Sequence, residues 1–286
     1  MREAHTRFDK PALIDDIWAQ TFVPDTEREA FLLSRAIRLA DYPSADAALA
    51  ASLRISAAYP SVILRARWAE DALQAAVTRG VRQYVIIGAG MDSFALRKPA
   101  FAKGIQIIEV DHPATQSYKR ERLRKAEVRI PQMLEFVAAD LSTTSLDGAL
   151  ENSSYRKEKL AFFAWLGVTM YLSREANLAT FRAIVRCSAP GSELAFNYVD
   201  ELEFDPSRQS KESKDVQHRV GSLGEAWVSG FNPADLSADL RAVGLTLQED
   251  IDGERISQRY YRGGVNALCP LTTSHYALAR VGTLTG

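Results

Sequence analysis

Short apolar runs alternate with helical stretches from Gly80 onward, and this alternation constrains the fold more than any other feature. The apolar runs are QYVIIG, IQIIEVD, MLEFVAAD, LAFFAWL and SELAFNYV, and helical stretches such as HPATQSYKRERLRKAE and REANLATFRAIVRCSA separate them. A further helix in NPADLSADLRAVG and late strands near residues 245–250 and 276–281 complete the set. Strands that alternate with helices form parallel crossovers, so the pattern predicts a doubly wound, mostly parallel α/β sheet of seven strands, Rossmann-like in type.

The first 80 residues have a different pattern. Apolar residues recur there at spacings of three and four, as in Ile63, Leu64 and Trp68, and no stretch resembles a strand. We therefore expect a helical segment over residues 1–80 and an α/β domain over residues 81–286. The charged stretch DELEFDPSRQSKESKDVQHRVGSLGE indicates a helical insert within that domain, at about residues 202–243.

Charge and cysteine content exclude several classes of protein. The formal net charge is −1 and the basic residues are scattered, which argues against nucleic acid or an anionic membrane as the partner and favours a small molecule. Cys187 and Cys269 form no CxxC motif, so neither a disulfide framework nor a metal site is expected. The N-terminal residues form no apolar signal-like run, and no apolar run approaches the ~18 residues of a membrane span, so we expect a cytoplasmic protein.

Two glycines follow the first predicted strand directly, in YVIIGAGMDS. Ligands of open α/β sheets bind beyond the carboxyl ends of the strands, which is where Gly88 and Gly90 lie. Without a Cβ they allow the backbone to approach a ligand closely, and they can expose peptide N–H groups to an anionic part of it. The third glycine of the dinucleotide fingerprint is missing, so the turn by itself fits a plain tight connection equally well.

Acidic residues end the next two predicted strands. Asp111 follows the glycine turn at roughly the ~20-residue offset at which an acid reaches ribose hydroxyls in such folds. Asp140, with Leu141 after it, ends the third strand. A glycine turn and two acids on consecutive strand ends suit a nucleoside. The alternative is that Asp111 and Asp140 only cap the helices that follow them.

At these residues the chain resembles the S-adenosylmethionine-dependent methyltransferases of the leucine carboxyl methyltransferase type, including bacterial relatives that methylate polyketides and other secondary metabolites. The matching segments are RARWAEDAL, VIIGAGMDSFALRKP, IIEVDHPATQSYKRERL, VAADL, WLGVTMYL, GEAWVSGFNPADLSADLRAVG and RYYRGGVNAL. The resemblance implies a class I methyltransferase fold, S-adenosylmethionine as the cofactor, S-adenosylhomocysteine as its product, and methyl transfer to a carboxylate or a phenol or other hydroxyl.

The resemblance also implies roles for particular residues. Arg65 and the turn of Gly88, Ala89 and Gly90 would hold the methionine carboxylate of the cofactor, with Arg67 as the rival to Arg65. Further cofactor contacts fall on Asp111 and His112 at the ribose, on Asp140 and Leu141 at the adenine edge, and on Leu166. The N-terminal helices would form a lid that supplies Arg65 and excludes water, although packing alone would also explain them.

Leu166 departs from the family pattern, because carboxyl methyltransferases of this group have an acid there. Leucine accepts no hydrogen bond, so the expected cofactor contact is lost or replaced by packing. The departure argues against a protein C-terminus as the substrate. It also keeps open a non-catalytic nucleoside-binding protein.

The acceptor side is less defined by the sequence. A carboxylate is already ionised at neutral pH and needs no base, whereas a phenol or alcohol requires one within ~3 Å. Tyr171, Tyr198 and His218 are the candidates for substrate positioning or for the base. Further candidates for the pocket are Met170, Asn197, Trp227 and Tyr261, and the aromatic residues could equally belong to the core. Asp92 could orient the glycine turn or cap the next helix.

A nicotinamide-dependent oxidoreductase is the nearest rival. Tyr155 and Lys159 have the Tyr-x-x-x-Lys spacing of short-chain dehydrogenases. The pair directly precedes the fourth predicted strand rather than lying on a helix beyond it, so we interpret the spacing as coincidence.

Overall fold

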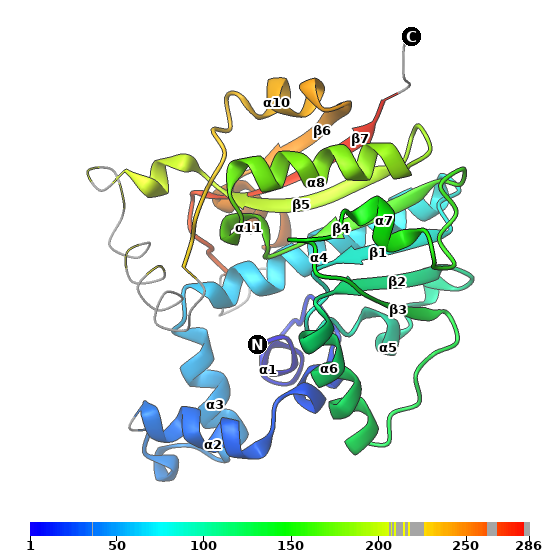
Figure 1. Cartoon of the computed structure of the whole chain (residues 1–286). Helices are drawn as coiled ribbons and strands as arrows, with labels where there is room; N and C mark the ends of the chain where they lie inside the picture. The colour runs from blue at the N-terminus through cyan, green and yellow to red at the C-terminus, as the bar shows by residue number, and fades with distance from the viewer. Residues whose placement is uncertain are drawn as a thin grey trace.

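The computed structural model describes residues 1–35, 37–205, 207, 209, 214, 217, 226–261 and 268–282. Its centre is a seven-stranded sheet in the order β3-β2-β1-β4-β5-β7-β6 (Figure 1). The strands are β1 Gln83–Ile87, β2 Gln106–Asp111, β3 Leu134–Ala138, β4 Ala161–Trp165, β5 Glu193–Val199, β6 Leu245–Ile251 and β7 Ser274–Val281. The predicted α/β fold is therefore confirmed, including both late strands.

The strand order explains which runs are apolar throughout. β1, β4 and β5 lie in the middle of the sheet and are buried at every position, as parallel strands covered on both faces require. β7 is antiparallel to both β5 and β6, and the remaining pairs are parallel. Because β2 and β4 lie on opposite sides of β1, the order reverses beside β1, and ligands of such sheets bind at this reversal.

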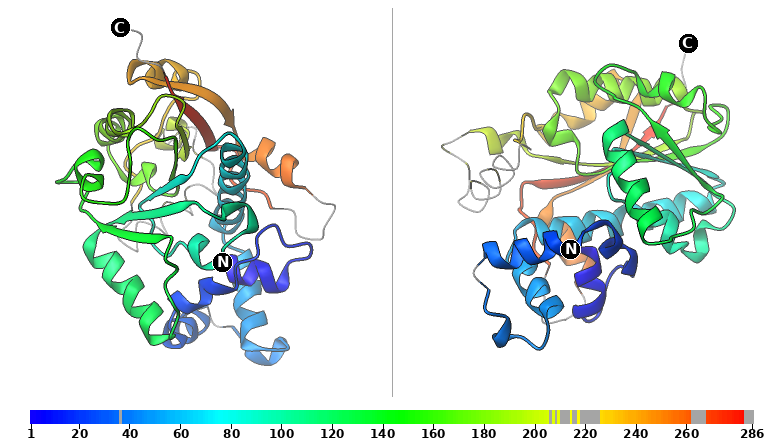
Figure 2. Two further views of the ribbon diagram at one scale, coloured as in Figure 1. Left: turned by 90° about the vertical axis from the view of Figure 1, so that its right-hand side faces the viewer. Right: turned by 60° about the horizontal axis from the view of Figure 1, so that its bottom comes forward.

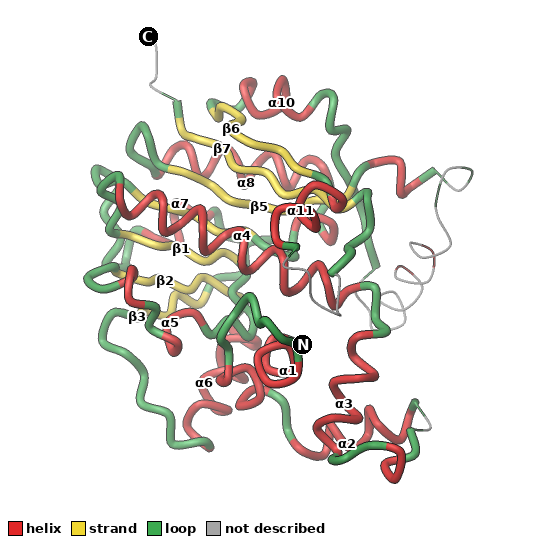
Figure 3. Tube along the Cα trace, turned by 180° about the vertical axis from the view of Figure 1, so that it is seen from behind, coloured by secondary structure: helices red, strands yellow, loops and turns green. Residues whose placement is uncertain are grey.

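Helices cover both faces of the sheet. α7, α8 and α10 pack on one face and α4, α5, α6 and α11 on the other, as the opposite views in Figures 1 and 3 show. The α-helices are α1 Arg2–Phe8, α2 Asp25–Ser34, α3 Ala45–Arg54, α4 Ala58–Thr78, α5 Phe94–Arg97, α6 Pro113–Lys125, α7 Leu146–Leu150, α8 Arg174–Cys187, α10 Leu236–Ala242 and α11 Gly253–Tyr260. Short 3₁₀ helices are η1 Ile17–Phe22, η2 Leu39–Asp41, η3 Ala100–Ala102, η4 Thr169–Tyr171 and η5 Glu201–Phe204.

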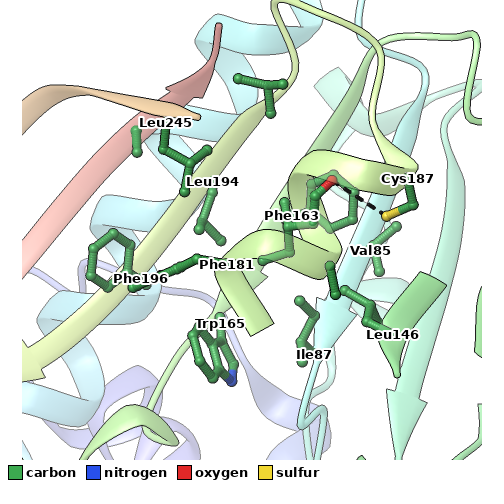
Figure 4. Packing of buried hydrophobic residues seen from close by; sticks show 14 of the residues in the cluster. Val85, Ile87, Leu146, Phe163, Trp165, Phe181, Cys187, Leu194, Phe196 and Leu245 are labelled. Carbon is green, nitrogen blue, oxygen red and sulfur yellow. Dashed lines mark hydrogen bonds between the residues drawn. The ribbon is translucent and has the colours of Figure 1, made fainter. Parts of the chain in front are cut away.

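The core under α8 holds the carboxyl end of β4 in place (Figure 4). Phe181 of α8 packs edge-on against Trp165 of β4 and Phe196 of β5, with ring centres 5.5 Å and 5.1 Å apart. Ser173 caps the helix, because its side chain accepts the backbone N–H of Ala176, as predicted. These contacts fix the chain segment that leaves β4 beside the edge where the ligand is expected.

The N-terminal segment lies at the same edge of the sheet (Figure 2). It is helical with no strand in its described residues, as predicted, and it contacts the turn after β1. Arg2 donates to the carbonyl of Met91 at 2.7 Å and to Asp16, and the Ser93 hydroxyl also donates to Asp16 at 2.6 Å. Asp16 is completely buried. This network ties the first 22 residues to the glycine turn.

In the described part of the chain, no helix alone has the length and apolarity to cross a bilayer. The pair α3 and α4, bent by 89° at their junction, meets the criterion on length and composition only. Much of the predicted insert at 202–243 lies outside the described residues, and its described part includes η5 and α10.

Candidate active site

Two cavities lie at the carboxyl edge of the sheet, near β1 and β4. The larger has a volume of about 640 Å³. Its lining includes the glycine turn, the tips of the second and third strands, Trp165, and the side of α8 that faces them. Five of the residues predicted for the cofactor meet here: Gly88, Asp111, His112, Asp140 and Leu141.

The glycine turn is held by the strand beside it. Gly88 and Gly90 have φ angles of 64° and 49°, in the left-handed region that favours glycine. The N–H groups of Gly88 and Ala89 donate to the Val110 carbonyl, at 2.9 Å and 3.3 Å, and the Gly90 N–H donates to Asp111. The expectation that these N–H groups face an anion is therefore corrected: β2 already uses them. The glycines instead permit the tight turn and a close approach.

Asp111 and Asp140 differ in what they hold. One oxygen of Asp111 accepts the Gly90 N–H and the other accepts the His112 N–H at 2.7 Å, so this carboxylate fastens the turn to the end of β2. It does not cap α6, because His112 does so by accepting the Ala114 N–H. Asp140 accepts both the N–H and the hydroxyl of Ser142, and these bonds lower its pKa. Asp140 therefore shapes the loop after β3.

Of the two roles predicted for Asp92, the structure shows that of a helix cap. Its carboxylate accepts the backbone N–H of Phe94 at 2.7 Å and so caps the first turn of α5. Ser93, beside it, bonds to Asp16 of the N-terminal segment.

The segment after β4 touches the glycine turn on one side and α4 on the other. A Cβ placed on Gly88 would lie 2.7 Å from a methyl carbon of Val168, and one placed on Gly167 would lie 2.7 Å from a guanidinium nitrogen of Arg65. Both distances are shorter than van der Waals contact and both glycines have a positive φ, so another residue at either position would be strained and would displace its neighbour. Gly167, with φ 72°, and Val168 thus separate the larger cavity from a second one.

The structure separates Arg65 from its rival Arg67. Arg67 forms an ion pair with Asp71 and donates to the Leu13 carbonyl. Arg65 lines the second cavity, and no described residue forms a hydrogen bond or an ion pair with its guanidinium. Burial lowers its pKa, yet an arginine remains charged at neutral pH. A partly buried guanidinium without a partner among the described residues indicates a missing anionic partner.

The second cavity is small, about 80 Å³. Besides Arg65 its lining includes Met170, Tyr171, Asn197 and Trp227, all of which the sequence offered for the acceptor pocket. The remaining lining residues come from the start of α4, the end of β5 and the start of β7 with the residues before it: Ala57, Ala58, Ser61, Val62, Val199, Leu271 and Ser274.

Asn197 orients the wall of this cavity. Its side-chain oxygen accepts the Gly167 N–H at 2.6 Å, and its backbone carbonyl accepts the Thr169 hydroxyl at 2.7 Å. Because a backbone N–H occupies the oxygen, the amide NH₂ is the end left for a ligand. In the described part of the chain, nothing accepts from that NH₂ group.

Other predicted residues lie elsewhere. Tyr198 is fully buried on the opposite face of β5, stacks on His275 and donates to Asp250 at 2.7 Å, so it lines neither cavity. Leu166 packs into the core beneath α4. Ala89 is buried in the same core, Tyr261 is exposed outside both cavities, and His218 lies outside the described residues.

The oxidoreductase motif lies at the wrong end of the sheet. Gln83, the first residue of β1, donates to the carbonyls of Arg156 and Lys159, so the Tyr155–Lys159 segment lies beside the amino ends of the strands. Tyr155 is buried and donates to the Cys187 carbonyl. It therefore cannot act at the carboxyl edge. Nor do the described residues include a cluster of His, Cys, Asp or Glu able to hold a metal ion.

Comparisons with known proteins agree with this geometry. The family model for leucine carboxyl methyltransferase matches residues 1–185. The chain belongs to this family. YktD of Bacillus subtilis, named as an S-adenosyl-L-methionine-dependent methyltransferase, is 30% identical over 96% of this chain and 93% of its own length. A Mycobacteroides abscessus protein with the same kind of name is 33% identical over 92% and 90%.

Solved structures share the fold at low sequence identity. A DUF574 family protein from Streptomyces avermitilis has a TM-score of 0.59 and 14% identity, covering 84% of this chain and 91% of its own. A Thermobifida fusca protein described as a methyltransferase has a TM-score of 0.54 and 16% identity, covering 84% and 89%. The fold is that of the class I S-adenosylmethionine-dependent methyltransferases.

S-adenosylmethionine is the cofactor of this methyltransferase, and the residues present fit it. The larger cavity has room for a nucleoside between the tips of the strands, with carboxylates at Asp111 and Asp140. Arg65 provides a free guanidinium for a carboxylate, in the fork geometry that suits such a pair. The missing Cβ at position 88 leaves room for Val168, which packs against the glycine turn beside this cavity.

Several residues of the site were not predicted from the sequence. Gly167 and Val168 lie in the quoted segment WLGVTMYL, and a glycine directly after a strand could have indicated a positive φ there. Arg2 and Asp16 carry no comparable signal, because nothing local shows that they reach a turn more than 70 residues away in the chain.

Proposed function

We propose that this methyltransferase methylates oxygen on a small molecule, a metabolite of secondary metabolism, and that the acceptor oxygen belongs to a carboxylate rather than to a phenol or alcohol. The observation that carries the proposal is the chemistry of the smaller cavity. With the Arg65 guanidinium assigned to the cofactor, it offers the acceptor the amide NH₂ of Asn197, and its described lining contains no Asp, Glu or His. Such a lining can hold a carboxylate through a hydrogen-bond donor and leaves a neutral hydroxyl without a base.

The chain's own residues then have separate tasks. Asp111 and the Asp140 loop hold the nucleoside end of the cofactor in the larger cavity. Arg65 pairs with the methionine carboxylate at the boundary between the cavities. Asn197 donates to the acceptor, and the walls from α4 and the segment after β4 exclude water. When bound, S-adenosylmethionine supplies a methyl group on a sulfonium, a reactive centre that needs alignment more than acid or base.

A carboxylate acceptor fits these tasks better than a hydroxyl. The carboxylate is ionised at neutral pH and attacks without losing a proton. A phenol or alcohol has to lose its proton during the transfer, and a general base typically contributes about 10²- to 10⁴-fold to such a step. Among the described lining residues no carboxylate or imidazole can accept that proton.

The test is a transfer assay with methyl-labelled S-adenosylmethionine against matched acids and phenols, followed by mild alkali. A methyl ester releases its label as volatile methanol, whereas an aryl or alkyl ether keeps it. We expect product with the acids, and alkali-labile label. Label that resists alkali would show a hydroxyl acceptor. The absence of transfer to either class, with S-adenosylhomocysteine still bound, would overturn the proposed function.

His218 provides a second, independent measurement. If the acceptor is a carboxylate, His218→Gln should leave kcat within about threefold of wild type, because no base is needed. A loss of about 100-fold or more, with unchanged affinity for S-adenosylhomocysteine, would assign His218 as the base and favour a hydroxyl.

A further inference from the structure

Trp227 forms one wall of the smaller cavity, and it comes from a segment that is distant in sequence from the rest of the lining. The indole is half-buried, whereas its neighbour Val228 is 55% exposed and does not line the cavity. The two adjacent side chains therefore differ in whether they can touch an acceptor.

Hydrogen bonds fix the segment that carries Trp227 to the frame of the cavity. The Val228 N–H donates to the Met170 carbonyl at 2.7 Å, and the Ser229 hydroxyl donates to the Leu172 carbonyl at 2.6 Å. Two residues on, the Phe231 N–H donates to the Val199 carbonyl at 3.1 Å. Met170 and Val199 themselves line the cavity. The residues that directly follow Trp227 thus attach it to the residues it faces.

Gly230 shows how closely this segment packs. A Cβ there would lie 2.5 Å from the Val199 carbonyl oxygen, so a side chain at this position would push the segment away from β5. The buried Asn177 also donates to the Ser229 hydroxyl, at 3.3 Å. A wall held at this many points cannot retreat without losing several hydrogen bonds, so the space it encloses has a defined size.

The enclosed space is smaller than an aromatic ring requires. An engineered apolar cavity that binds benzene has a volume of about 150 Å³, and the volume here is about 80 Å³. The lining also includes the small side chains Ala57, Ala58 and Ser61. Trp227 has the largest side chain of the described lining, so shortening it would widen the cavity while Arg65 and Asn197 stay in place.

We infer that Trp227 determines acceptor specificity by size: it admits short aliphatic carboxylates and excludes aryl carboxylates. This inference rests on the proposed function, since it concerns the acceptor of the same transfer. It assigns no chemical role to the indole. The reaction centre and the cofactor contacts are unchanged when the indole is shortened.

The experiment compares wild type, Trp227→Ala and Trp227→Leu, with Val228→Ala as the matched control. The probes are propionate and benzoate, assayed with methyl-labelled S-adenosylmethionine. We expect Trp227→Ala to raise the ratio of kcat/KM for benzoate over propionate at least about 10-fold, in the range that pocket-size changes produce. The affinity for S-adenosylhomocysteine should stay within about threefold. Trp227→Leu should change the ratio in the same direction by less, and it provides the measurement if the alanine variant fails to fold.

Each other outcome has a defined meaning. A ratio that stays unchanged in both Trp227 variants, or that Val228→Ala changes equally, would overturn the inference. The proposed function would still stand in that case, provided that wild type methylates either acid. If wild type methylates neither acid, the proposed function is in question separately. Calorimetry of benzoate and propionate binding in the presence of S-adenosylhomocysteine then tests the size limit. A gain of affinity for benzoate alone in Trp227→Ala supports the limit, and equal affinities in all variants overturn it.

Discussion

The two cavities at the carboxyl edge differ in whether the charged side chains assigned to the cofactor already have partners. In the larger cavity Asp111 bonds to the glycine turn and Asp140 bonds to Ser142, so the protein itself holds these side chains in place. In the smaller cavity the guanidinium of Arg65 has no partner among the described residues. The contrast teaches that internal bonds fix the acids of the first cavity, whereas the guanidinium of the second is left for a ligand.

A single substitution at the boundary between the cavities should damage both cavities. Gly88→Ala would force a side chain into the left-handed region and against Val168. We expect a loss of about 2 to 5 kcal/mol of unfolding free energy, from strain and overpacking together. Methyl transfer should fall at least about 100-fold. Chemical denaturation and the transfer assay measure these effects.

Gly90→Ala is the matched control for this prediction. Gly90 belongs to the same turn and has a similar φ angle, but its nearest contact for a Cβ is 4.0 Å away. It should lose only about 1 to 2 kcal/mol through strain. Equal losses in the two variants would show that the contact with Val168 is unimportant and that the boundary is not a shared wall.

Arg65→Met tests the smaller cavity, where the guanidinium has no partner among the described residues. Removing a charge-assisted bond to a ligand should weaken S-adenosylhomocysteine binding by about 1.5 to 3 kcal/mol, or roughly 10- to 150-fold. The unfolding free energy should not fall, because the substitution removes a partly buried charge that has no partner among the described residues. Arg67→Met removes an ion pair with Asp71 and serves as the control, with unchanged affinity. Unchanged affinity in Arg65→Met itself would refute its assignment to the cofactor.

Substitutions of Asp111 test the larger cavity, where internal hydrogen bonds hold the acids in place. Asp111→Ala should weaken S-adenosylhomocysteine binding about 10-fold or more and also lower the unfolding free energy by about 1 to 3 kcal/mol, because the Gly90 N–H loses its acceptor. Asp111→Asn keeps an oxygen for that N–H but turns its NH₂ toward the His112 N–H, so the unfolding free energy should fall less than in Asp111→Ala while the affinity still falls. Calorimetric titration together with urea unfolding separates the two effects. Wild-type affinity in Asp111→Ala would sink the ribose assignment.

The sequence predicts the larger cavity better than the smaller for a physical reason. Parallel strands end at one edge, so residues at the ends of successive strands, such as Gly88, Asp111 and Asp140, come together by topology alone. What the pattern could not show is the direction of the turn's N–H groups. Hydrogen bonds to the Val110 carbonyl decide that, and they depend on the register of β1 against β2.

The smaller cavity depends on packing between distant segments. Residues from α4, η4, β5 and the Trp227 segment line it, and no periodicity in the sequence shows that they meet. Periodicity likewise could not separate Tyr198 from Asn197, which are adjacent on β5 and point to opposite faces. Once the register of β5 is known, only Asn197 can face the cavity.

The smallest expected effect lies at the outer wall of the larger cavity, where Arg186 of α8 pairs with Asp147 of α7 at 2.9 Å. This pair lowers the pKa of Asp147 to about 2. A depressed carboxyl pKa stabilises the fold above the ordinary value of 3.8 and loses that effect as the pH falls toward 2. Because both side chains are partly exposed, Arg186→Met should cost less than about 1 kcal/mol at pH 7. The difference from wild type, measured by urea unfolding at pH 7, 4 and 3, should shrink as the pH falls. Arg182→Met, which removes an exposed arginine from the same wall, is the control. A loss of unfolding free energy above about 2 kcal/mol that persists at pH 3 would contradict this prediction. It would show that the wall formed by α7 and α8 depends on a polar contact that the protein cannot replace.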